Sequence, residues 1–148
     1  MGTLLDIAIH RAPRGEMIRL EEAWVTPAHG VADDFRGSPG WRQITVVSHA
    51  DWEAVCGGLG TDLDWVIRRA NLLIDGIELQ RSTGQVLCIG EARLVVTGES
   101  RPCERMDAAH HGLREALSPQ WRGGVCCRVA AAGRIRAGDT VSMEPGGA

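Results

Sequence analysis

Short apolar segments recur along the whole chain between glycine, proline and aspartate residues, and this pattern constrains the fold more than any other feature. Segments rich in valine, isoleucine and leucine that are bounded in this way are typical of β-strands. Helices should therefore be the minority in a mainly β fold with a few short helices. The predicted strands are Leu4–His10, Met17–Val25, Gln43–Val47, Leu72–Asp75, Val86–Ile89, Arg93–Thr97, Val125–Ala130 and Thr140–Met143.

Three turn segments lie between predicted strands: Ile89–Ala92, Ala131–Arg134 and Ala137–Thr140. Each contains a glycine, which supplies the positive φ that tight hairpins need. The turns predict that the strands they join are antiparallel neighbours. Because closure removes exposed sheet edges, so many short strands favour a closed or nearly closed β-barrel.

Two segments are typical of helices. Ser48 offers a hydroxyl N-cap with Asp51 three positions later, and the pattern continues until Gly57-Gly58 ends it. The second predicted helix runs from Asp107 to about Leu117 and is ended by Pro119. We expect both helices to pack on the outside of the barrel.

The bulk composition fits one globular domain spanning residues 1–148. A formal net charge of −3 argues against a nucleic-acid partner. The sequence has neither the run of about 20 apolar residues that crosses a bilayer nor the pattern of a signal peptide, so we expect a cytoplasmic protein without a membrane partner. Its five cysteines form no CxxC pair, which predicts reduced thiols and neither a disulfide framework nor a zinc site.

Cys103 is the main candidate for chemistry. It lies in a loop between a predicted strand and a predicted helix, and such loops commonly carry function. The nearby Arg101 and Arg105 would favour the thiolate, a nucleophile and a ligand for soft metals, whereas Glu99 and Glu104 would oppose it. A loop cysteine without a role is the alternative.

Two further segments carry arginine. Arg68-Arg69-Ala70-Asn71 stands immediately before a predicted strand, and arginine side chains suit phosphate and carboxylate groups. In Trp121-Arg122-Gly123-Gly124, the two glycines allow close approach to a ligand or to another strand. The alternative for the first segment is a solvated charge cluster, and the alternative for Gly123-Gly124 is a β-bulge. No GxGxxG, P-loop, HExxH or GxSxG motif supports the familiar nucleotide-binding and hydrolase classes.

Taken in order, the motifs of this chain resemble those of the molybdenum cofactor sulfurase C-terminal (MOSC) domain family, in its small stand-alone bacterial form. Each motif is weak alone, but the ordered series spans nearly the whole chain. The motifs are His29-Gly30-Val31-Ala32-Asp33-Asp34-Phe35, Arg42-Gln43-Ile44-Thr45, Arg69-Ala70-Asn71-Leu72-Leu73-Ile74-Asp75-Gly76-Ile77, Ile89-Gly90, Pro102-Cys103, Arg122-Gly123-Gly124-Val125 and Gly133-Arg134-Ile135-Arg136-Ala137-Gly138-Asp139.

This resemblance implies a MOSC-type β-barrel in which Cys103 matches the functional cysteine of the family. In related reductases the matching cysteine ligates molybdenum, and in the sulfurases the domain is thought to receive or carry sulfur. We therefore predict Cys103 as the catalytic residue and metal ligand, and Arg69, Asn71, Arg101 and Arg122 as cofactor-binding residues. Where relatives have two arginines directly before the asparagine, Ala70 intervenes here.

Three functions follow as hypotheses. In the first, the protein binds the molybdenum cofactor (molybdenum and pterin) through Cys103 and supports reduction of N-hydroxylated compounds, with an electron-transfer protein as partner. In the second, a Cys103 persulfide accepts sulfur from a cysteine desulfurase and passes it to a metal centre. In the third, the chain is a non-catalytic interaction domain. The larger reductases and sulfurases have an additional N-terminal barrel domain that supplies cofactor contacts, which we do not expect in a chain of this length.

Overall fold

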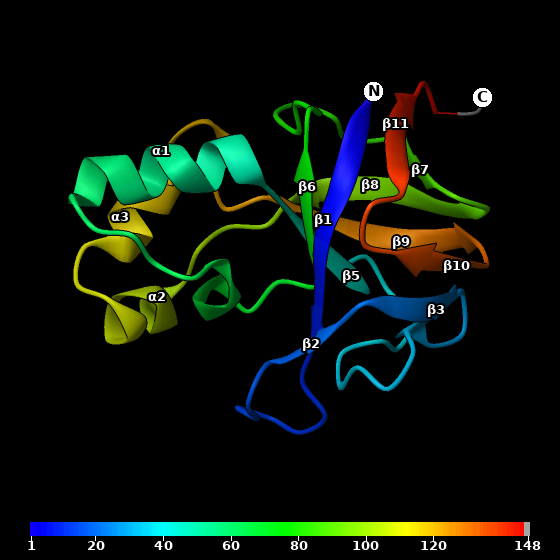
Figure 1. Ribbon diagram of the computed structural model, residues 1–148, viewed down its shortest axis with the longest axis horizontal. Coiled ribbons are helices and arrows are strands. Elements are labelled where there is room, and N and C mark those ends of the chain that lie inside the picture. The colour runs from blue at the N-terminus through cyan, green and yellow to red at the C-terminus, as the bar shows by residue number, and fades with distance from the viewer. Residues whose placement is uncertain (147–148) are drawn as a thin grey trace.

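A computed structural model describes residues 1–146 of the protein and confirms a mainly β fold with short helices (Figure 1). The helical elements are α1 (His49–Leu59), α2 (Glu104–Ala109), α3 (Leu113–Leu117), and the 3₁₀ helices η1 (Trp65–Arg68) and η2 (Pro119–Trp121). The strands are β1 (Gly2–Ile9), β2 (Ile18–Leu20), β3 (Glu22–Thr26), β4 (Gly30–Val31), β5 (Ile44–Ser48), β6 (Leu72–Asp75), β7 (Val86–Ile89), β8 (Ala92–Glu99), β9 (Val125–Ala131), β10 (Gly133–Arg136) and β11 (Thr140–Glu144).

Seven strands form the closed barrel that the sequence predicts. They follow the order β11-β7-β8-β9-β5-β6-β1, and the antiparallel pairing of β1 with β11 closes the circle, with Gly2 opposite Val141. The β5–β6 pair is parallel. Strand β2 extends the sheet beside β1, and β10, β3 and β4 form a separate three-stranded sheet. In the described part of the chain, closure leaves β2 as the edge strand of the large sheet.

The strands β1, β5 and β6 separate two hydrophobic clusters. Alternation along β5 places Val46 in the barrel core and Val47 in the outer cluster, and Leu72 and Leu73 divide in the same way along β6. The outer cluster includes residues from all three α-helices, which cover one side of the barrel, as Figure 1 shows. The expected position of the helices outside the barrel is therefore confirmed.

Three strand and turn predictions were wrong. The predicted strand Met17–Val25 is two strands, because β2 pairs with β1 whereas β3 pairs with β10 in the other sheet. The predicted turn Ala131–Arg134 is mostly strand, with only Ala132 between β9 and β10. The turn Ala137–Thr140 exists, with Gly138 at φ 99°, but it joins strands of different sheets instead of paired neighbours. The hairpin at Ile89–Ala92 is confirmed.

Both predicted helices have different ends. Helix α1 begins after the Ser48 cap, whose hydroxyl accepts a hydrogen bond from the Asp51 N–H, but it continues through Gly57 and Gly58 and ends before Gly60. Gly60 has φ 70° and its N–H donates to the Cys56 and Gly57 carbonyls, so it takes the C-cap role expected of the earlier glycines. The predicted helix Asp107–Leu117 is two helices, α2 and α3, because Gly112 adopts the left-handed conformation between them.

Within the described residues, no helix is both long enough and apolar enough to cross a membrane.

Candidate functional site

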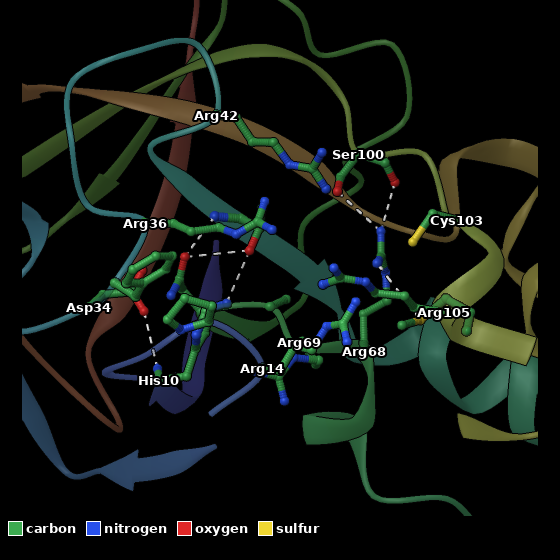
Figure 2. Close-up of a pocket in the computed structure, with 16 residues that line it drawn as sticks. His10, Arg14, Asp34, Arg36, Arg42, Arg68, Arg69, Ser100, Cys103 and Arg105 are labelled. Atoms are coloured by element: carbon green, nitrogen blue, oxygen red, sulfur yellow. Dashed lines mark hydrogen bonds between the residues drawn. The ribbon is translucent and has the colours of Figure 1, made fainter. Parts of the chain in front are cut away.

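A cavity of about 160 Å³ opens where several loops meet beside the barrel (Figure 2). Its walls come from the segment after β1, the β4–β5 loop, the residues around the end of η1, and the segment from the end of β8 into α2. Six arginines line it, together with Asp34 as its single acidic residue. The arginines are Arg14, Arg36, Arg42, Arg68, Arg69 and Arg105.

Cys103 lines this cavity from the N-cap position of α2. Its backbone is extended (φ −115°, ψ 178°), and its side chain makes no capping hydrogen bond to α2. All five cysteines are free thiols, but Cys103 is exposed whereas the other four are buried. In Figure 2 its sulfur lies beside the guanidinium that donates to Ser100. The site thus offers a reachable thiol next to positive charge.

That guanidinium belongs to Arg68, the last residue of η1, which is only 7% exposed. Its Nε donates to the Gly123 carbonyl at 3.1 Å, and its Nη2 donates to the Ser100 carbonyl and hydroxyl at 2.9 and 3.1 Å. These acceptors are neutral, and no carboxylate among residues 1–146 forms an ion pair with Arg68. Burial, and secondarily repulsion by Arg42, lowers the pKa of Arg68 to about 10, while the Cys103 and Cys126 sulfurs act in the opposite direction.

Arg69 and Asn71 lie in the same cavity as Cys103. Arg69 adopts a left-handed conformation (φ 63°) after η1, and its Nη2 donates to the Gly15 carbonyl at 2.7 Å. Burial lowers its pKa, with further lowering by Arg105 and Arg36. Asn71 is buried and ties strands together, since its Oδ1 accepts from the Thr45 N–H at 3.0 Å and its Nδ2 donates to the Ala8 carbonyl at 3.2 Å.

The structure places Arg101 and Arg122, the other two predicted cofactor-binding residues, outside the cavity lining. The Arg101 side chain is 86% exposed, with its Nε 3.7 Å from Glu99 Oε1. Arg122 donates to Gln120 at 3.4 Å. The glycines after Arg122 bring backbone to backbone: a Cβ on Gly124 would lie 2.1 Å from the Val46 carbonyl oxygen. Close approach between strands therefore explains the glycines of this motif, and the Arg122 side chain does not line the cavity.

Sequence reasoning missed Arg14, Arg36 and Arg42, and gave neither Arg68 nor Arg105 a binding role. The Arg68-Arg69 pair was the available signal, but nothing local distinguishes Arg14 or Arg36 from arginines on the surface. The loop carrying Arg36 is fixed through its neighbours: Asp34 accepts a hydrogen bond from the His10 N–H at 3.2 Å, and the Phe35 N–H donates to the His10 carbonyl at 2.7 Å.

The fold is shared with solved structures of low sequence identity. The YuaD protein from Bacillus subtilis superposes with a TM-score of 0.80 at 17% identity, covering 98% of this chain and 97% of that one. YiiM from Geobacillus stearothermophilus superposes with a TM-score of 0.76 at 15% identity, covering 97% of this chain and 75% of that one. For YiiM from Escherichia coli the TM-score is 0.70 at 15% identity, with 95% of this chain and 69% of that one covered.

No curated protein matches the chain by sequence. The family model described as "MOSC domain" matches residues 29–142, which is most of the chain and includes every cavity-lining segment except the one after β1. The expected family is thereby confirmed: the chain belongs to the MOSC domain family.

Proposed function

We propose that this protein binds the molybdenum cofactor, with Cys103 as the protein ligand of molybdenum, and supports reduction of N-hydroxylated compounds. One observation carries the proposal: the exposed cysteine of the chain lines the cavity into which six arginines converge. Membership of the MOSC family supports it, because these domains are associated with this cofactor.

The residues present fit the chemistry of the group. A thiolate is a soft ligand that suits such a metal, and guanidinium groups suit the phosphate of a pterin. Within residues 1–146, no group of three or more histidine, cysteine, aspartate or glutamate side chains could hold a metal ion. The cofactor itself would then supply the remaining metal ligands.

When bound, the cofactor would supply a redox-active metal able to exchange two electrons with a substrate. Cys103 would hold it from the protein side, while Arg69 and Arg105 bind anionic groups. Reduction of an N-hydroxylamine to an amine and water consumes two electrons and two protons, so an external electron donor is required. His10 also lines the cavity, with its Nδ1 2.9 Å from the Ala12 carbonyl oxygen.

The test is the metal and pterin content of protein purified from a host that makes the cofactor. We expect stoichiometric molybdenum and pterin fluorescence, with molybdenum lost in Cys103→Ser and retained in Cys88→Ser, whose thiol is buried in the barrel wall. Metal-free protein that also fails to bind supplied cofactor would contradict the proposal.

A sulfur-carrier role is the second candidate, and the exposure of Cys103 beside Arg68 and Arg105 favours it. The Cys103 thiolate would attack the terminal sulfur of a desulfurase persulfide; the donor S–S bond breaks, a new S–S bond forms on Cys103, and the desulfurase thiol is released. Neighbouring cations would stabilise the persulfide anion.

Intact mass distinguishes this candidate. After incubation with a cysteine desulfurase and cysteine, the protein should gain the mass of one sulfur atom, and Cys103→Ser should not. Absence of an adduct on the unaltered protein would reject sulfur carriage while leaving cofactor binding to its own test.

A further inference from the structure

The cavity concentrates the positive charge of an acidic protein. Its lining includes six of the sixteen basic residues of the chain, all of which are arginine, and one of the nineteen acidic residues. The rest of the chain therefore holds ten basic and eighteen acidic residues. A positive cavity within a protein of net charge −3 selects anions and repels cations over distances comparable to the Debye length.

The arginine charges are not neutralised within the described part of the chain. No ion pair among residues 1–146 includes any of the six cavity arginines. Arg68 and Arg69 donate to backbone carbonyls, a serine hydroxyl and a methionine sulfur. The Asp34 carboxylate accepts from the His10 N–H. An anionic ligand would thus meet six cations and one carboxylate, that of Asp34.

The arginines also repel one another from two sides. Beyond the effect of burial, repulsion by Arg42 lowers the pKa of Arg68, which lies beside Cys103. Repulsion by Arg105 and Arg36 likewise lowers the pKa of Arg69. Figure 2 shows Arg42 entering from the side of Ser100, whereas Arg14 and Arg69 lie on the opposite side of the view and Arg36 and Arg105 flank them. Because arginine stays protonated at neutral pH, bringing anionic groups to both sides would relieve this repulsion.

We propose that the charged part of the ligand bound here is a diphosphate, either inorganic or in an ester such as a nucleoside diphosphate. The proposal rests on the proposed function in that it concerns the same cavity, and it specifies how many phosphate groups the arginines accept. An orthophosphate carries about two negative charges at neutral pH. A diphosphate carries more charge on two linked groups, and each group can accept from guanidiniums on its own side of the cavity.

The experiment titrates metal-free protein by calorimetry with pyrophosphate, orthophosphate, ADP and AMP in EDTA at one ionic strength. We expect pyrophosphate to bind at least about tenfold more tightly than orthophosphate, and ADP to exceed AMP by a similar factor. If pyrophosphate alone shows this preference, the ligand is inorganic diphosphate; if ADP shows it too, the cavity accepts esters. Equal affinities within both pairs would overturn the proposal.

Two nearby arginines provide matched variants. Arg105 lines the cavity, whereas Arg101, four residues earlier, points into solvent. Arg105→Gln should weaken pyrophosphate binding by about tenfold, and Arg101→Gln by less than about twofold. Equal losses would show that general surface charge binds the anion, and would overturn the proposal. Failure of cofactor binding is detected separately, as missing molybdenum and pterin in the purified protein.

Discussion

At the scale of single residues, Arg68 joins the structure of the site to its electrostatics. Its guanidinium connects Ser100, which follows β8, to Gly123, which precedes β9. Along the chain, Ser100 comes before α2 and Gly123 comes after α3. The arginine therefore holds the site together and also places a cation beside Cys103, as Figure 2 shows.

Replacing Arg68 by methionine should lower the free energy of unfolding by about 1–3 kcal/mol, because the Gly123 and Ser100 carbonyls would lose their buried donors. Urea denaturation followed by circular dichroism measures this change. The control is Arg101→Met, which should stay within about 0.5 kcal/mol of the unaltered protein because its side chain is exposed. An equally stable Arg68→Met would show that these hydrogen bonds do not support the fold.

Thiol reactivity gives a second prediction at this scale. A maleimide should label only Cys103 in the folded protein and all five cysteines in denaturant. The reason is exposure, reinforced by burial, which raises the pKa of Cys88 and Cys126 and strongly raises that of Cys127. Peptide mapping by mass spectrometry identifies the labelled site; rapid labelling of Cys126 in folded protein would contradict the burial described here.

At the scale of elements, α1 departs from its sequence prediction in an informative way. A glycine pair is a common helix stop, yet Gly57 and Gly58 lie inside this helix and only Gly60 has a positive φ. Packing of Trp52 and Val55 against the outer face of the barrel stabilises the helix in spite of the glycines that follow them.

Gly58→Ala should therefore raise the free energy of unfolding by about 0.5–1 kcal/mol, since alanine favours helix and a Cβ there meets nothing within 4 Å. Gly60→Ala is the matched variant and should lower it by about 1 kcal/mol, because φ 70° is strained for a residue with a Cβ. Thermal or urea denaturation measures both. The opposite order of the two variants would contradict the observed end of α1.

At the scale of the whole molecule, the barrel core and the outer cluster share strands β1, β5 and β6. Neither cluster can lose these strands without disrupting the other. If residues 1–148 form a single domain, as the sequence predicts, the two clusters should therefore unfold together in one cooperative transition.

Unfolding in urea should show one transition, with the same midpoint for far-ultraviolet circular dichroism, which reports the strands, and for tryptophan fluorescence, to which Trp52 and Trp65 of the outer cluster contribute. Two separated midpoints would show that the helical side and the barrel unfold independently.

Local chemistry was enough to predict much of the protein. Ser48 and Asp51 mark a helix start through a hydrogen bond between neighbours in sequence, and the Ile89–Ala92 hairpin depends on Gly90 alone for its positive φ. Cys103 could be singled out because a loop between a strand and a helix, and its neighbouring arginines, are visible in the sequence. The order of the motifs was enough to place the chain in its family.

The tertiary structure alone decided which strands share a sheet and which arginines share the cavity. Splitting of the segment around Glu21 depends on β10 pairing with β3, more than one hundred residues away along the chain. Arg14 follows β1, whereas Arg105 lies in α2 between β8 and β9, and the two meet at one cavity only because the barrel brings these distant segments together. Sequence patterns report the few residues around each position, whereas charge at this site is the sum over segments that only folding brings together.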